Sequence, residues 1–278
     1  MKGIISGVKR MEIHDGAGLR STVFFKGCPL RCRWCHNPES LSFEPQTAYF
    51  AEKCLHCGAC GGERNADAAA KCPVNALVPY GEEIEARDLA ERLLQDEPFF
   101  QASGGGVTLS GGECLAQIGF AAETARLVRE RGVGVDIDTC GCVPRSSVEK
   151  ILPYADTFLY DLKAMDPDLH RALTGRDNAL ILDNLRFLAS RGADVEIRYP
   201  LVVGCNDGEC AAIGAFLKEL GIKRIKVLRY HDLAASRYEA LGLQNTLPPP
   251  LTTLAHVEQA VKILSSFGLD AVNGALAD

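Results

Sequence analysis

The sequence predicts an α/β protein built from βα units whose strands run parallel. Past residue 80, short runs rich in Val, Ile, Leu and Tyr alternate with amphipathic stretches that have helical spacing. Six such units can be counted, enough for either an open doubly wound sheet or a partial barrel. One cysteine-, glycine- and alanine-rich segment, at about 50–80, breaks the alternation and reads as an insertion.

The six strands are expected where apolar and β-branched residues form short continuous runs. They lie at 21–27, 106–112, 133–141, 156–163, 194–203 and 222–230. The amphipathic stretches between them predict helices at 84–100, 116–132, 146–155, 177–193, 208–221 and 251–268. Gly132 ends the second of these helices, and the proline-rich run 246–250 forms a rigid loop before the last.

Composition narrows the class of protein. The chain has 278 residues and a net charge of -6, so it presents no polyanion-binding surface and no nucleic-acid partner is expected. No apolar run approaches the ~18 residues of a membrane span, and the first residues do not form a signal peptide. We therefore expect a cytoplasmic protein, in which the 12 cysteines are metal ligands, catalytic thiols or small buried residues.

Three of these cysteines, Cys28, Cys32 and Cys35, form the pattern C-x3-C-x2-C directly after the first strand. That position places them at the carboxyl end of a strand, where α/β folds carry their active sites. Three thiolates can hold three irons of a [4Fe–4S] cluster and leave the fourth iron open to a ligand. A zinc site made of the three cysteines and His36 is the alternative on spacing alone.

The aromatic Trp34 before the third cysteine completes a motif that resembles the radical S-adenosylmethionine (SAM) enzymes. The stretches "HDGAGLRSTVFFKGCPLRCRWCHNPE" and "SGGGVTLSGGE" are further similar to the activating enzymes of glycyl radical enzymes. So are "DTCG", "YDLK", "IRYPLV" and "LRYHDLA", in the same order. The resemblance implies that SAM supplies the fourth ligand of the cluster.

The resemblance also assigns roles to residues at later strand ends. It implies that Trp34 and the run Gly111, Gly112 and Glu113 belong to the SAM site, the run holding the SAM amino group at a glycine turn that lets a ligand approach. It places Lys163, Arg198 and His231 around SAM and Asp15 near the glycine loop of the protein substrate.

Two acids, Asp138 and Asp161, end successive strands. Taken alone, such a pair is more often involved in helix capping or a salt bridge. The resemblance implies instead a monovalent-cation site formed by Asp138, Thr139, Asp161 and the Leu159 carbonyl. The chain departs from the family at Cys140 and Val203, and neither residue is expected to touch a ligand.

Four more cysteines lie in the insertion: Cys54, Cys57 and Cys60 at C-x2-C-x2-C spacing, then Cys72 followed by Pro73. In bacterial ferredoxins, three close cysteines and a remote Cys-Pro have this spacing. We expect a second, complete [4Fe–4S] cluster here, with a zinc knuckle as the alternative. The larger activating enzymes carry eight cysteines in this region, so the chain resembles a reduced version of them.

The sequence therefore predicts a partial (β/α)6 barrel of the radical SAM type, from 1–49 and 81–278, with a ferredoxin-like insertion at 50–80. The resemblance implies a monomeric enzyme that receives an electron from reduced flavodoxin or ferredoxin and cleaves SAM. The resulting radical takes a hydrogen atom from a backbone glycine of a partner glycyl radical enzyme. The alternatives are a radical SAM enzyme that acts on a small molecule or another peptide, and a ferredoxin-type electron carrier.

Overall fold

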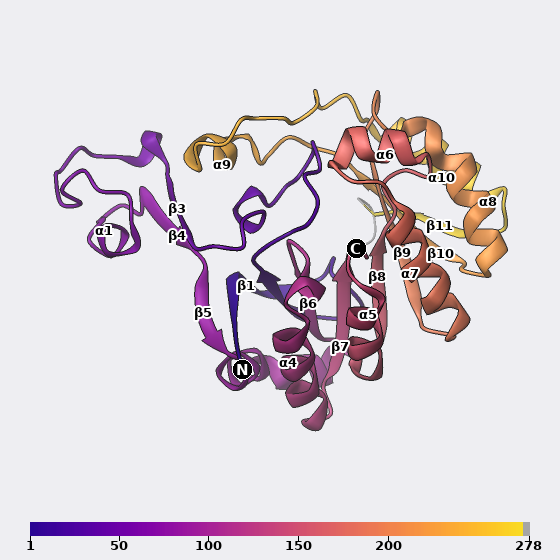
Figure 1. Cartoon of the computed structure of the whole chain (residues 1–278), viewed down its shortest axis with the longest axis horizontal. Coiled ribbons are helices and arrows are strands. Elements are labelled where there is room, and N and C mark those ends of the chain that lie inside the picture. The colour runs from indigo at the N-terminus through magenta and orange to yellow at the C-terminus, as the bar shows by residue number, and fades with distance from the viewer. Residues whose placement is uncertain (275–278) are drawn as a thin grey trace.

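The computed structural model describes residues 1–274, and its centre is a nine-stranded, mostly parallel sheet (Figure 1). The strand order is β11-β10-β9-β8-β7-β6-β2-β1-β5. The strands are β1 (Lys2–Glu12), β2 (Arg20–Phe25), β5 (Glu82–Glu85), β6 (Gly106–Gly111), β7 (Gly134–Thr139), β8 (Thr157–Asp161), β9 (Val195–Leu201), β10 (Arg224–Arg229) and β11 (Asp270–Asn273). All six strands expected from the sequence are present, as β2 and β6 to β10.

The order of the parallel strands decides between the two architectures left open by the sequence. From β2 through β6, β7, β8, β9 and β10 to β11, neighbours in the sheet follow one another along the chain and pair in parallel. A doubly wound sheet would reverse its order at a switch point. Continuous order with right-handed crossovers instead places the helices on one face, as in a barrel. The strand order agrees with the expected partial barrel and not with a doubly wound sheet.

Three strands of this sheet escaped the sequence analysis. The strand β1 carries charged residues and two glycines and pairs antiparallel with both β2 and β5. Short β5 has the sequence EEIE, and short β11 has the sequence DAVN, so neither presents an apolar run. Their pairing partners, rather than their own composition, make them strands.

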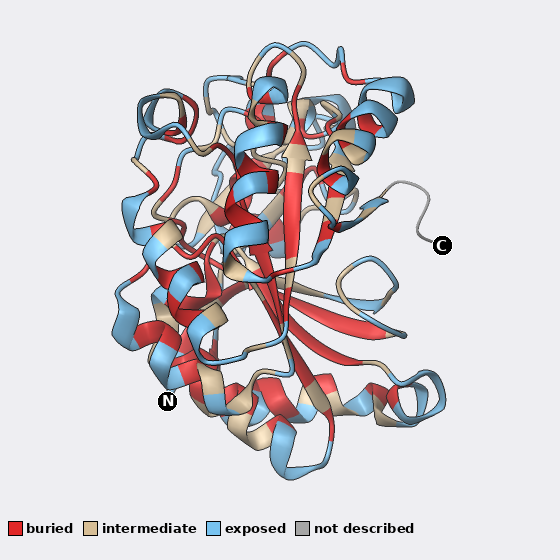
Figure 2. Cartoon of the chain, turned by 90° about the vertical axis from the view of Figure 1, so that its right-hand side faces the viewer, coloured by how far each residue is buried: buried red, intermediate tan, exposed pale blue. Residues whose placement is uncertain are grey.

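Helices cover the outer side of the sheet and bury their apolar faces against it (Figure 2). They are α2 (Ala86–Leu93), α3 (Glu97–Ser103), α4 (Ile118–Glu130), α5 (Arg145–Ile151), α7 (Ala179–Ser190), α8 (Cys210–Leu220) and α10 (Leu254–Ser265). The helices α6 (Pro167–Thr174) and α9 (Ala235–Ala240) instead pack in separate small clusters, with Trp34 and with the base of the insertion. The single helix expected at 84–100 is divided into α2, a 3₁₀ turn and α3, because Pro98 fits only the first turn of a helix. No helix within residues 1–274 is long and apolar enough to cross a membrane.

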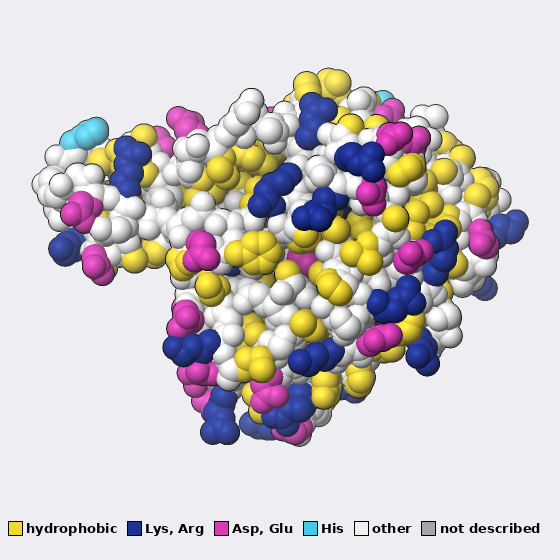
Figure 3. All heavy atoms as spheres, in the orientation of Figure 1, with side chains coloured by type: hydrophobic (Ala, Val, Ile, Leu, Met, Phe, Trp, Pro, Cys, Tyr) yellow, Lys and Arg dark blue, Asp and Glu magenta, His cyan; other side chains and the backbone are white. Residues whose placement is uncertain are grey.

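The cysteine-rich segment projects from the sheet on its own small base (Figures 1 and 3). Strands β3 (Gln46–Tyr49) and β4 (Leu77–Tyr80) pair antiparallel and bring the two ends of the segment together. Between them lies the short helix α1 (Ala66–Ala70), whose alanines pack with Leu77. The sequence showed no strand periodicity in 50–80. The strand β4 nevertheless lies within that range, and its pairing with β3 is what makes it a strand. The last four residues of the range 81–278 lie outside the described part.

Two glycines explain how the end of β6 reaches the end of β2. Gly111 has a φ of +113°, and a Cβ there would lie 2.2 Å from the Phe25 nitrogen. A Cβ on Gly112 would lie 2.4 Å from the Ser40 carbonyl oxygen and 2.5 Å from that of Gly27. Both glycines are therefore required for the backbone after β6 to pack directly against the loop that carries the three cysteines.

We predict that Gly112→Ala lowers the free energy of unfolding by ~1–3 kcal/mol, because the clashing atoms are backbone and cannot turn aside. Thermal unfolding of the cluster-free protein measures this. The matched control is Gly208→Ala, since nothing lies within 4 Å of a Cβ there. Equal melting temperatures for the two variants would contradict the packing explanation.

Candidate active site

The three-cysteine loop, residues 28–40, follows β2 at the carboxyl edge of the sheet. Its near end is tied to the C-terminal end of α6, because Arg31 N donates to Thr174 O at 2.7 Å and Arg33 N to Leu173 O at 3.0 Å. Its far end returns to β2, since Gly27 N donates to Ser40 O at 2.9 Å. The loop is thus closed on itself by backbone bonds and faces the ends of β6, β7 and β8.

Cys28 is buried, and Cys32 and Cys35 are half-buried. Burial raises the pKa of both Cys32 and Cys35 to about 12. The neighbouring thiol of Cys140 lowers the pKa of Cys28, against the effect of burial. Cys140 directly follows β7, and β6 lies between β7 and β2 in the sheet, so the loop after β2 reaches across the end of β6 to approach it.

Glu113 is fully buried beside this loop, and its carboxylate is held by donors at the end of β7. It accepts from Thr139 Oγ1 at 2.8 Å, from Cys140 N at 2.9 Å and from Leu115 N at 3.0 Å. Burial nevertheless raises its pKa. These bonds fix the GGE turn in place, and they show that the Thr139 hydroxyl points toward Glu113.

The acids at the strand ends form an ion-pair network with two buried cations. Lys163 Nζ lies 2.6 Å from Asp161, and Arg198 lies 3.3 Å from Asp15 and 3.5 Å from Asp138. The structure therefore brings together five predicted residues from β7, β8, β9 and the connection between β1 and β2. Burial, opposed by Arg198 and assisted by the charge of Asp161, raises the pKa of Asp138 to about 6. The salt-bridge alternative applies to both acids in this structure.

Two buried nitrogen atoms at this edge lack a hydrogen-bond partner among the described residues. They are Nε of Arg198 and Nδ1 of His231. An unsatisfied buried polar group is costly, so such atoms are typical of a site that binds a polar ligand. A nitrogen donor can bind the carboxylate of SAM, and neighbouring acids can bind its amino group. The residues beside the three thiols therefore fit SAM. Val203, the second residue at which the chain departs from the family, donates its N–H to Thr252 Oγ1 at 3.1 Å.

Trp34 has a packing role that the sequence did not separate from cofactor binding. Its side chain is buried with Leu173, Val202 and Tyr230 behind the loop. His36, next along, stacks on the ring of His231 with centroids 4.1 Å apart, and burial lowers its pKa to about 4. Nothing in the sequence pattern indicated the stacking of these two histidines.

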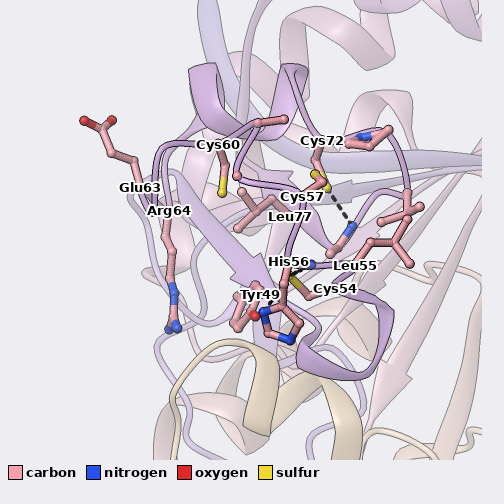
Figure 4. A pocket seen from close by; sticks show the side chains of 16 residues that line it. Tyr49, Cys54, Leu55, His56, Cys57, Cys60, Glu63, Arg64, Cys72 and Leu77 are labelled. Carbon is pink, nitrogen blue, oxygen red and sulfur yellow. Dashed lines mark hydrogen bonds between the residues drawn. The ribbon is translucent and has the colours of Figure 1, made fainter.

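The four cysteines of the insertion line one cavity of about 290 Å³, on separate turns of the segment (Figure 4). Cys72 Sγ accepts from Ala76 N at 3.2 Å, and backbone donors around it lower its pKa. Cys54 Sγ accepts from His56 N at 3.4 Å. Sulfur atoms cradled by N–H groups suit a thiolate-bound cluster. Within residues 1–274, no three His, Cys, Asp or Glu residues are grouped closely enough to hold a single metal ion.

The sequence analysis missed two further residues that line this cavity. They are Tyr49 and Arg64, and the guanidinium of Arg64 lies 4.2 Å from the Tyr49 ring centroid. They come from the base strand β3 and from the turn before α1. No sequence signal pointed to them, because only the folded segment brings them together.

Comparisons with known proteins agree with this geometry. The sequence profile of the Radical SAM superfamily matches residues 22–217. A domain of a pyruvate-formate lyase-activating enzyme from Bacteroides vulgatus superposes with a TM-score of 0.51 at 28% identity, covering 61% of this chain and 98% of that one. Streptococcus suis SuiB bound to S-adenosylmethionine shares the fold, with a TM-score of 0.60 at 16% identity over 88% of this chain and 48% of that one.

Three relatives of this chain are activating enzymes. The trans-4-hydroxy-L-proline dehydratase activating enzyme of Clostridioides difficile is 39% identical, covering 87% of this chain and 88% of that protein. The pyruvate formate-lyase 2-activating enzyme of Escherichia coli is also 39% identical, over 86% of this chain and 80% of that protein. The choline trimethylamine-lyase activating enzyme of Oleidesulfovibrio alaskensis is 37% identical over 87% of each chain.

The chain is thus a radical SAM protein, an oxidoreductase whose superfamily implies a [4Fe–4S] cluster and SAM. Within that superfamily it belongs to the activating enzymes of glycyl radical enzymes.

The raised pKa of Asp138 gives a prediction with a definite sign. Between about pH 4 and pH 6 the folded chain holds a proton on Asp138 that the unfolded chain has lost, so stability falls as the pH rises through this window. Asp138→Asn carries no such proton. Its free energy of unfolding, relative to wild type, should rise by ~2–3 kcal/mol from pH 4 to pH 7.

Urea unfolding of the cluster-free protein at both pH values tests this prediction. The control is Asp183→Asn, whose side chain is 60% exposed and pairs only with Arg186 on the surface. A difference between Asp138→Asn and wild type that stays constant with pH would show that Asp138 is not a buried titrating group.

Proposed function

We propose that this enzyme cleaves SAM reductively and abstracts a hydrogen atom from a backbone glycine of a partner glycyl radical enzyme. One observation carries the proposal: relatives at 37–39% identity over most of the chain are activating enzymes for three different partners. The three-cysteine loop supports the proposal, because the loop lies beside charged strand ends that could bind the amino and carboxylate groups of SAM.

In this proposal, Cys28, Cys32 and Cys35 hold three irons of the cluster and leave one open to SAM. The bound cluster and SAM supply one-electron cleavage and a primary carbon radical. Lys163 and the free Nε of Arg198 are placed to bind the SAM carboxylate. His231 offers its buried Nδ1 to a polar group of the same ligand. The Glu113 turn holds the amino group near the cluster, with Trp34 packing behind the loop.

The charge at this edge supports a bound monovalent cation. Four carboxylates, those of Asp15, Glu113, Asp138 and Asp161, lie near two side-chain cations, so an excess of two negative charges remains when all are ionised. In the proposal a cation lies by Asp138, Asp161, the Thr139 residue and the Leu159 carbonyl. The Thr139 hydroxyl is already bonded to Glu113, which leaves its carbonyl as the ligand.

We predict that potassium or sodium stimulates SAM cleavage and that Asp161→Ala removes the stimulation and weakens SAM binding. Rates of 5′-deoxyadenosine release are compared in salts of potassium, sodium and a large organic cation. Equal wild-type rates in all three salts would remove the cation from the proposal.

The second proposed cofactor is a complete [4Fe–4S] cluster in the insertion, residues 50–80, bound by Cys54, Cys57, Cys60 and Cys72. Its support is the shared cavity and the N–H donors to Cys54 and Cys72. In the proposal the insertion is a ferredoxin-like unit on the barrel of 1–49 and 81–278. The electron donor is a reduced flavodoxin or ferredoxin, and the enzyme acts as a cytoplasmic monomer.

We predict about eight irons per anaerobically reconstituted chain and about four after Cys54, Cys57, Cys60 and Cys72 are all replaced by Ala. The variant should still cleave SAM with dithionite, because the loop of 28–40 is untouched, and should be slower with flavodoxin or in partner activation. Stoichiometric zinc in protein purified without oxygen would refute the second cluster.

The proposed reaction is tested by mixing the reduced enzyme and SAM with candidate glycyl radical enzymes, including those that act on hydroxyproline, choline and pyruvate. A glycyl doublet in the EPR spectrum is the expected outcome for at least one partner. Cys35→Ala is the negative control. Formation of 5′-deoxyadenosine with no doublet from any candidate would favour a small-molecule or other peptide substrate.

A further inference from the structure

The connection after β10 crosses the three-cysteine loop and is here called the strap, residues 231–246. It contains α9 and lies beside the loop and the base of the insertion (Figure 1). The sequence analysis assigned only its first residue. Four side chains of the strap contact the loop. None of these contacts is a salt bridge between two exposed side chains.

The first contact reaches a predicted cluster ligand directly. Tyr238, on α9, is 3% exposed, and its hydroxyl donates to the backbone carbonyl of Cys35 at 3.1 Å. On the other side of the peptide chain, Cys35 N donates to Cys32 O at 3.1 Å. The Tyr238 hydroxyl therefore holds the carbonyl of Cys35, and a hydrogen bond within the loop holds its N–H.

The second contact holds the turn that follows. Arg237 Nη1 donates to Glu39 Oε1 at 2.9 Å and to Asn37 Oδ1 at 3.4 Å. Glu39 is largely buried, and Arg237 is its ion-pair partner. The backbone carbonyl of Glu39 accepts from the buried Lys26 at 2.6 Å. The 3₁₀ turn at Pro38–Ser40 is thus held between α9 and β2.

Two weaker contacts complete the strap. The ring of His231 stacks on His36, and His36 Nε2 lies 2.6 Å from the His231 carbonyl oxygen. Near the other end, Thr246 Oγ1 donates to Arg33 O at 3.2 Å. The strap therefore touches the loop on both sides of Cys35.

The opposite face of α9 rests on the insertion. Ala240 is buried with Ala48 and Phe50, which belong to the base of the cysteine-rich segment. One short helix therefore contacts both the three-cysteine loop and the base of the insertion. A helix of six residues is not stable alone, so its position depends on these two contacts.

We propose that Arg237 and Tyr238 are positioning residues that set the geometry of Cys35 and the turn after it, and thereby the open iron that SAM binds. The inference rests on the proposed function, because it assumes a cluster on the three-cysteine loop. Neither side chain touches the thiols. They act through the Cys35 carbonyl and through Glu39, and they leave the spacing of the other two cysteines unchanged.

The test uses the full-length, anaerobically reconstituted enzyme reduced with dithionite. SAM is titrated while the EPR spectrum of the open-iron cluster is recorded. Tyr238→Phe should raise the SAM concentration for half-maximal spectral change by about two- to tenfold, the effect of one lost hydrogen bond. The matched control is Tyr230→Phe, which loses a buried hydroxyl bond to the Pro248 carbonyl in the adjoining chain but none to the loop.

A second series tests Arg237. Arg237→Gln should shift the titration in the same direction, and Arg237→Lys should restore most of it because a cation again faces Glu39. The double variant Arg237→Gln, Glu39→Gln should resemble Arg237→Gln alone, because the two substitutions remove the same ion pair. Melting temperatures identify variants that simply fail to fold.

The outcomes separate the inference from the proposed function. If the wild-type spectrum does not respond to SAM, the proposed function fails. If the wild type responds and Tyr238→Phe and Arg237→Gln titrate like wild type and Tyr230→Phe, the positioning role is overturned. Lysine rescue together with a normal Tyr230→Phe titration supports it, because general destabilisation would affect the two tyrosine variants alike.

Discussion

The guanidinium of Arg198 joins the parts of the chain that meet at the carboxyl edge of the sheet. It lies on β9, donates to the His14 carbonyl at 2.8 Å and pairs with Asp15 and with Asp138 at the end of β7. Three half-buried acids, Asp15, Asp138 and Asp161, can lie this close together because this cation and Lys163 lie among them. The connection between β1 and β2 is thereby held across the mouth of the partial barrel. The same arrangement leaves Nε of Arg198 without a partner and free for a ligand.

Around this charged centre, the three-cysteine loop is supported from every side by parts of the chain distant in sequence. The end of α6 holds its beginning, the glycine turn after β6 packs beneath it, and α9 covers its end. Lys26, which is fully buried, ties the far end to the base of the insertion through Glu39 O and Gln46 Oε1. Burial lowers the pKa of Lys26 to about 8. The loop and the base of the insertion therefore share one buried support.

Much of this fold was predictable because its central strands are apolar runs set between amphipathic helices. The six strands β2 and β6 to β10 follow from that pattern, and so does their meeting at one edge. Strands such as β1 and β5 could not be predicted, since their charged residues become strand only through pairing. At the site, the cysteine spacing indicated the loop, and the resemblance indicated the charged residues. The contact between Cys140 and Cys28, and those of Tyr238, Arg237, Tyr49 and Arg64, depend on tertiary neighbours that no local pattern encodes.

The central claim is that the carbon radical formed at this site takes its hydrogen atom from a glycine of a partner protein. It is tested most directly with a partner glycyl radical enzyme produced with glycine deuterated at Cα. The reduced enzyme is incubated with SAM and this partner, and 5′-deoxyadenosine is analysed by mass spectrometry. The account predicts that the product carries one deuterium when the partner is labelled and none when it is not. Unlabelled 5′-deoxyadenosine from a labelled partner that nevertheless becomes active would contradict it.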